Sequence, residues 1–111
     1  GALTTVHQFC KLGDFSFVGM NTSINMDVPA FVKVAADPAR VIGLNTIGMS
    51  RNGIEDSSIS LIKKAYKLVY RKGLKIEQAI KKIKDLDNDI NDPNLKTFIK
   101  SIEVSERGIL R

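Results

Sequence analysis

The chain has 111 residues, of which 43% are hydrophobic and 26% charged, and its formal net charge is +5. This length suits one small domain with a modest core. The composition is that of a globular chain and excludes a disordered one. No apolar run approaches the roughly 20 residues of a membrane span, so we expect no membrane insertion. The basic excess suits an acidic protein partner. No aromatic-rich strand, arginine cluster or zinc-ligand set favours nucleic acid, so we expect no nucleic-acid binding.

Four aliphatic residues near the start of the chain recur every six positions, at Val6, Leu12, Val18 and Ile24. Small residues follow them at fixed offsets, among them Cys10, Gly13, Ser16, Gly19 and Thr22. This rhythm predicts a parallel β-helix, in which each hexad is a short strand plus a turn and three hexads close one coil. A pair of alternating strands in a small mixed domain is the alternative.

Residues 1–29 would form fewer than two such coils. A β-helix needs about three stacked repeats to bury its core. We therefore expect the chain to be the end of something longer, with an apolar edge uncovered near Leu3 and Val6. The single cysteine, Cys10, cannot form an internal disulfide, which suits a reducing compartment and a cytoplasmic location.

The rhythm ends at Asp27–Pro29, where a proline closes the last hexad. Residues 30–54 then form an extended connecting segment, and within it we expect residues 30–49 to be extended and irregular. Pro38 interrupts this stretch, which contains apolar pairs at Phe31–Val32 and Val41–Ile42.

Residues 55–111 predict a domain of three amphipathic helices joined by short links. The first begins with Asp56 or Ser57 as its cap and runs to about Lys72, where Gly73 stops it. Its inward stripe consists of Ile59, Ile62, Tyr66 and Val69. The second helix spans 76–90. The third begins at Pro93 with Asp92 as its cap and buries Leu95, Phe98, Ile99 and Ile102.

Five short stretches of this chain occur in an order typical of one enzyme family: Thr5–Cys10, Asp27–Pro29, Gly43–Asn45, Ala65–Leu68 and Arg107–Arg111. The series is similar to the C-terminal part of the acyl-ACP:UDP-N-acetylglucosamine O-acyltransferases, which begin lipid A synthesis. The resemblance runs over essentially the whole chain. Its most specific part is the Val-His-Gln-Phe-Cys stretch that ends at Cys10.

The resemblance implies the terminal coils of a left-handed parallel β-helix followed by a helical C-terminal domain, assembled as a homotrimer. It implies transfer of an (R)-3-hydroxyacyl group from acyl carrier protein to the 3-hydroxyl of UDP-N-acetylglucosamine. It also implies that a histidine, which is poised for proton transfer at neutral pH, serves as the base. That histidine belongs to upstream coils, so we expect this chain to contain no catalytic residue and to be inactive alone.

Substrate-binding roles follow from the resemblance for four residues. His7 and Gln8 would face the cleft between subunits, where the alternative is a polar pair on the coil surface. Asn45 would contact ligand in the same cleft, where the alternative is a turn-forming residue. Arg51 would reach a nucleotide diphosphate, which a guanidinium can bind through two parallel hydrogen bonds. Two successive arginines are common there in the family, whereas this chain has Asn52 in second place.

Two further features carry expectations about the acyl chain and its carrier. Met20 matches the position that limits acyl length, where a methionine would favour a shorter chain than glycine. The alternative is a methionine that fills an irregular gap. Lys63, Lys67 and Arg71 lie four apart on the first predicted helix and would form an exposed stripe for the acidic carrier protein. The alternative there is a solvated helix face.

The sequence has no glycine-rich phosphate loop, metal-ligand spacing or Ser/His/Asp set, so we expect neither a metal nor a cofactor. A different hexapeptide-repeat acyltransferase is one rival interpretation, although the Val-His-Gln-Phe-Cys stretch argues against it. The other rival is a stand-alone, non-enzymatic module that binds an acidic protein.

Overall fold

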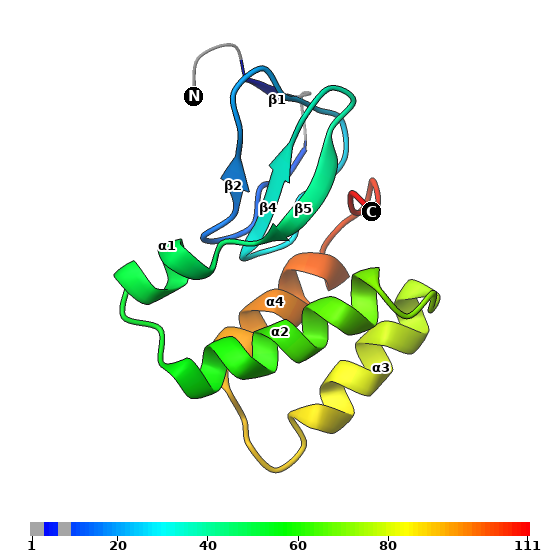
Figure 1. The fold of residues 1–111 in the computed structure, drawn as a ribbon. Helices are drawn as coiled ribbons and strands as arrows, with labels where there is room; N and C mark the ends of the chain where they lie inside the picture. Colours follow the sequence, from blue (N-terminus) through cyan, green and yellow to red (C-terminus); the bar gives the residue numbers. More distant parts are fainter. Residues whose placement is uncertain (1–3, 7–9) are drawn as a thin grey trace.

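A computed structural model describes residues 4–6 and 10–111 of the chain. A layer of short strands lies over a layer of helices (Figure 1). The described elements are, in order, β1 (Thr5–Val6), β2 (Phe17–Val18), β3 (Ser23–Ile24), β4 (Val32–Ala35), β5 (Arg40–Leu44), α1 (Thr46–Arg51), α2 (Asp56–Tyr70), α3 (Ile76–Leu86) and α4 (Pro93–Glu103).

Val6, Leu12 and Val18 each pair in parallel with a residue of the next turn, and the first of these pairs is the one that the six-residue rhythm predicts. Val6 pairs with Ile24, three hexads further along the chain. In the next two pairs, Leu12 with Val28 and Val18 with Val34, the sequence separation of the paired residues is two residues less than three hexads. The coil thus continues past Pro29, and its second turn is shorter than its first.

Burial differs sharply between the two members of each stacked pair. Ile24 and Val28 are each 2% exposed, whereas Val6 is 42% and Leu12 45% exposed. An aliphatic that points into a coil is buried only where a further coil covers it. The predicted apolar edge is therefore present at Val6, while Leu3 lies outside the described residues.

Gly13 allows the two turns of the coil to approach closely. A Cβ at this position would lie 2.2 Å from the backbone nitrogen of Ala30. The backbone of Gly13 is also hydrogen-bonded to Val28, at 2.7 Å. No side chain fits between these two backbones. This explains why the repeat has a glycine at position 13.

Residues 30–49 are extended in part, as predicted, but the prediction that they are irregular is wrong. β4 and β5 pair in antiparallel fashion, with an irregularity between Lys33 and Val34. Pro38 lies in the turn between these strands and follows a cis peptide bond. Residues of β4 alternate between buried and half-buried, so the segment completes a sheet of order β2-β4-β5. It also contains α1, a fourth helix that the sequence did not indicate.

The three longer helices match their predicted positions, with corrections at the ends. The inward stripe of α2 is buried as predicted. Its cap is Glu55, which makes no side-chain capping bond, and Asp56 is its first residue. α3 ends at Leu86, before Ile90, because Asp87 begins a turn there. Asp92 caps α4 with Pro93 at its first position, as predicted.

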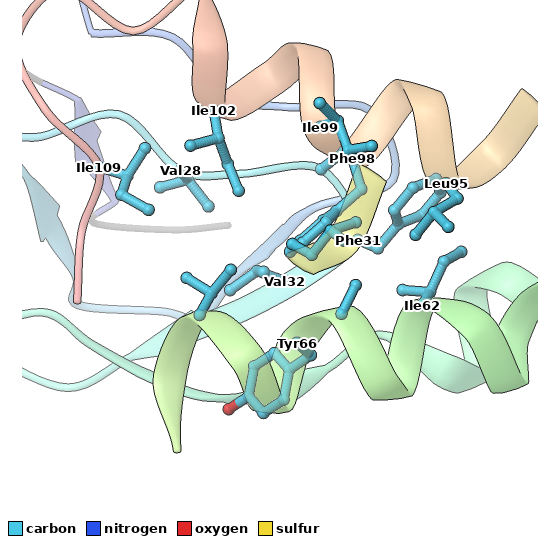
Figure 2. Packing of buried hydrophobic residues seen from close by; sticks show 14 of the residues in the cluster. Val28, Phe31, Val32, Ile62, Tyr66, Leu95, Phe98, Ile99, Ile102 and Ile109 are labelled. Carbon is cyan, nitrogen blue, oxygen red and sulfur yellow. The ribbon is translucent and has the colours of Figure 1, made fainter. Parts of the chain in front are cut away.

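The core lies where the coil meets the helices. Figure 2 shows Phe31 and Val32 between Ile62 of α2 and Phe98 of α4. All four of these side chains are 0% exposed. The coil and the helices therefore share one hydrophobic cluster and stabilise each other.

Asp27 joins the coil to the segment that follows α4. Its carboxylate accepts hydrogen bonds from the Lys11 N–H at 2.7 Å and from the Ser105 hydroxyl at 2.6 Å. Its backbone N–H donates to the Gly108 carbonyl, and its carbonyl accepts from the Leu110 N–H. The side chain is 2% exposed, so these bonds stabilise a carboxylate that has lost most of its water.

The C-terminal tail then continues onto α2. The Tyr70 hydroxyl donates to the Leu110 carbonyl at 2.8 Å. The Arg111 guanidinium donates to the carbonyls of Val69 and Leu74. The tail, which the sequence indicated only as a short extension, thus contacts both layers of the fold.

A polar network fixes the turn between α3 and α4. The buried Asp87 accepts hydrogen bonds from the Asp92 N–H and from the Lys96 ammonium, each at 2.7 Å. Asp92 in turn accepts from the Ser58 hydroxyl of α2. Burial raises the pKa of Asp87, but the bonds from Lys96 and Asp92 outweigh it and leave that pKa below its ordinary value.

We predict that Gly13→Ala lowers the free energy of unfolding by about 1–3 kcal/mol, because the added methyl would overlap the Ala30 backbone. Gly19→Ala is the matched control, since the nearest atom to its Cβ would be the Ala35 Cβ, at 3.2 Å, and the nearest backbone atom would be at 3.6 Å. Urea unfolding measures both variants. Equal losses in the two would contradict the close approach at Gly13.

We predict that Asp87 stabilises the fold more at neutral than at acid pH. Its pKa is lowered on folding, so its contribution is complete above the unfolded pKa of about 4 and is lost as pH falls through the folded pKa. Asp87→Asn should therefore destabilise the protein most at neutral pH and progressively less on acidification. Urea unfolding over a pH series measures this, and a constant difference from the parent would contradict it.

Candidate functional site

Asn45 begins α1 and uses both polar atoms of its side chain within the chain. Its Oδ1 accepts a hydrogen bond from the Gly48 N–H at 3.1 Å, which is a helix N-cap. Its Nδ2 donates to the Phe15 carbonyl at 3.0 Å. Its backbone N–H donates to the Phe31 carbonyl at 2.7 Å. Asn45 thus joins α1 to two turns of the coil.

Phe15 and Phe31 occupy the same corner of successive turns. Their rings stack with centroids 5.7 Å apart and an interplanar angle of 8°. Both residues have positive φ, 57° for Phe15 and 68° for Phe31, a conformation that is costly for a bulky side chain. The stacking and the bonds to Asn45 hold this corner in place beside α1.

Arg51 is the last residue of α1, and its side chain is exposed. The next residue, Asn52, folds back on the helix: its Nδ2 donates to the Gly48 carbonyl at 2.7 Å. Asn52 therefore closes α1 and does not extend away from it. The cation exposed at this end of the helix is Arg51.

Met20 lies between β2 and β3. Its side chain is 67% exposed, so it does not fill a gap in this chain. His7 and Gln8, the other predicted cleft residues, lie outside the described residues. Of the predicted site residues that the structure describes, Asn45 and Arg51 lie at the two ends of α1, and Met20 lies in the turn after β2.

The basic stripe on α2 is exposed as predicted. Lys63, Lys67 and Arg71 all face solvent, and the Arg71 guanidinium lies 5.9 Å from the centre of the Tyr66 ring. By contrast, Lys84 and Lys96 on the next two helices pair with Glu103 and Asp87. Within the described part of the chain, no salt bridge joins Lys63, Lys67 or Arg71 to a carboxylate.

Residues 4–6 and 10–111 contain no group of three or more His, Cys, Asp or Glu side chains that could hold a metal ion. Over the same residues, no helix is both long enough and apolar enough to cross a membrane.

Sequence reasoning missed the supporting residues of this region. Gly48 lies against the Asn45 amide, since a Cβ there would be 2.3 Å from Nδ2. Asn is a preferred helix N-cap residue, so Asn45 itself was the available signal for α1. Asn52 and Asp27 carried no comparable local signal.

Comparison with known proteins assigns the family. Residues 27–110 match the family described as UDP N-acetylglucosamine O-acyltransferase, domain 2. The acyl-[acyl-carrier-protein]–UDP-N-acetylglucosamine O-acyltransferase of Ectopseudomonas mendocina is 45% identical over 108 residues, which are 97% of this chain and 41% of that protein. The chain thus spans about two fifths of the length of the curated relatives it matches.

Solved structures agree with this assignment. The UDP-N-acetylglucosamine O-acyltransferase from Moraxella catarrhalis has a TM-score of 0.90 at 38% identity, covering 97% of this chain and 41% of that one. The UDP-N-acetylglucosamine acyltransferase from Francisella novicida has a TM-score of 0.89 at 36% identity, covering 97% and 39%. From the match over 27–110 and these likenesses, the chain belongs to the UDP-N-acetylglucosamine O-acyltransferase family and resembles its C-terminal segment.

Proposed function

We propose that this chain is the C-terminal part of an acyltransferase that moves an (R)-3-hydroxyacyl group from acyl carrier protein to the 3-hydroxyl of UDP-N-acetylglucosamine. The observation that carries the proposal is the match of 97% of the chain to acyltransferases of this name, in sequence and in fold. The exposed apolar edge at Val6 and Leu12 supports it, because further coils would bury that edge.

In this proposal the protein is a cytoplasmic homotrimer of left-handed β-helices, and the substrate cleft lies between neighbouring copies. His7, Gln8 and Asn45 belong to that cleft, and Arg51 binds the nucleotide diphosphate. The exposure of Arg51 supports its role, since an exposed guanidinium can bind two phosphate oxygens. The base that takes the proton from the sugar hydroxyl lies in upstream coils. This chain itself supplies binding and assembly, and no cofactor takes part.

We propose that α2 docks the carrier protein. The stripe of Lys63, Lys67 and Arg71 is exposed and follows the helix axis. Acyl carrier proteins are acidic, and complementary charge increases the rate at which such partners meet. This surface would hold the carrier while the acyl group enters the cleft.

The same basic stripe favours one alternative, a stand-alone module that binds an acidic protein without acyl transfer. The two functions differ in their response to the sugar nucleotide. A salt-sensitive complex with acyl carrier protein, together with no response to UDP-N-acetylglucosamine, would support the module.

The proposed function predicts that the native protein is longer than this chain and active. Antibody capture from extracts of the source cells, followed by intact-mass measurement, should give a mass well above 12.3 kDa. The captured protein should acylate UDP-N-acetylglucosamine when supplied with an (R)-3-hydroxyacyl carrier protein. A native mass near 12.3 kDa without acyl transfer would contradict the proposal and favour the binding module.

Met20 should limit the length of the transferred acyl group. In the native-length protein, Met20→Gly should raise the rate for longer acyl chains relative to shorter ones by about ten-fold or more, because the methionine side chain no longer fills the groove. Ile90→Ala is the control, since Ile90 is also exposed but lies in the turn before α4. Competition between acyl carrier proteins of two chain lengths measures the ratio. An unchanged ratio in Met20→Gly would rule out this role.

A further inference from the structure

The C-terminal tail contacts the end of α2 that carries Arg71. The Nη2 atom of Arg111 donates to the Val69 carbonyl at 2.7 Å and to the Leu74 carbonyl at 2.8 Å. These two carbonyls lie on either side of Arg71 in the sequence. One guanidinium therefore joins the last turn of α2 to the segment that follows the helix.

The Val69 carbonyl is one that α2 cannot satisfy by itself. The last four carbonyls of an α-helix have no partner further along the helix, and α2 ends at Tyr70. An arginine suits such carbonyls, because its positive charge also faces the negative end of the helix dipole. We therefore expect the last turn of α2 to open more readily without Arg111.

Tyr70 provides a second contact between the tail and this end of the helix. Its hydroxyl donates to the Leu110 carbonyl at 2.8 Å. Burial raises the pKa of Tyr70, so the hydroxyl stays protonated and remains a donor. The Tyr70 ring packs on the Tyr66 ring, with centroids 4.9 Å apart. Because the Arg71 guanidinium lies 5.9 Å from the centre of the Tyr66 ring, this pair of rings links the tail to Arg71.

The tail is itself fixed to the coil. The Leu110 N–H donates to the Asp27 carbonyl at 2.8 Å, and the Asp27 N–H donates to the Gly108 carbonyl at 3.1 Å. Ile109, between these two tail residues, is 7% exposed. The tail therefore gives the end of α2 a support that the coil holds in place.

We infer that Tyr70 and Arg111 are positioning residues for carrier-protein docking, which they support by holding Arg71 in the basic stripe of α2. The inference rests on the proposed docking of the carrier on that stripe. Arg71 is the C-cap of α2, whereas Lys63 and Lys67 lie within the helix. Arg71 is therefore the stripe residue whose position depends most on the tail.

A double-mutant cycle in the native-length protein tests this, with an (R)-3-hydroxyacyl carrier protein as the probe and its dissociation constant as the measurement. Arg71→Gln should weaken binding about five-fold, because one cation leaves the stripe. Arg111→Gln should weaken it about three-fold in the parent protein and hardly at all in the Arg71→Gln protein. An equal loss in both backgrounds would overturn the inference, because Arg111 would then act independently of Arg71.

Tyr70→Phe separates positioning from a direct contact between Arg111 and the carrier. It removes the hydrogen bond to Leu110 and changes no charge, so it should weaken carrier binding about three-fold, again only when Arg71 is present. Parent-like affinity in Tyr70→Phe would overturn the inference. Lys84→Gln is the control matched in charge: it removes one cation of the helical domain, together with its ion pair to Glu103, and should leave the affinity unchanged.

The affinity for UDP-N-acetylglucosamine separates positioning from a general loss of folding. It should stay at the parent value in both Arg111→Gln and Tyr70→Phe, and a parallel loss of both affinities would overturn the inference. The Arg71 N–H, which donates to the Lys67 carbonyl, should exchange its hydrogen faster in Arg111→Gln, and parent-like protection would also overturn it.

Two results would instead count against the proposed docking itself. They are an unaltered protein that does not bind the carrier, and an Arg71→Gln protein that binds it as the parent does. Intact carrier binding that is weakened by Arg71→Gln, with additive losses in the double mutant, overturns the positioning role alone.

Discussion

The buried Asp27 carboxylate is the interaction on which the arrangement of the two layers depends. It accepts hydrogen bonds from Lys11 in the first turn of the coil and from Ser105 after α4. A carboxylate removed from water is stable only while its hydrogen bonds are kept. The coil and the end of the helical domain must therefore stay in register, and the tail bonded to the Asp27 backbone is held against α2.

The shortening of the second coil turn determines where the site residues lie. The sequence separation between stacked residues is three full hexads for Val6 and Ile24. It is two residues less for Leu12 and Val28. Phe15 and Phe31 consequently stack at one corner. β4 then pairs with the antiparallel β5, which ends the parallel ladder and leads the chain directly into α1.

The proposed binding and docking functions fall on different elements of this fold. α1 presents Arg51 beside the coil, and α2 presents its basic stripe. α2 is fixed through its buried stripe, whereas α1 depends on two asparagines and one buried methionine. A short helix held by polar contacts is more sensitive to single substitutions than a long helix held by a hydrophobic face. We therefore expect the proposed nucleotide binding to be more easily lost by substitution than the proposed docking.

The sequence by itself determined the features that arise from local periodicity and capping. The hexads indicated the stacking of Val6 on Ile24, and the apolar stripe of α2 and the Asp92 cap of α4 were equally readable. The sequence did not reveal the β4–β5 pairing or the contacts of Asp27, Asn45 and Asn52. Asp27 meets Ser105 across 78 residues and Asn45 meets Phe15 across 30. Only the tertiary structure decides such contacts. The local sequence pattern does not indicate which distant backbone groups will need a hydrogen-bond partner once the two layers pack together.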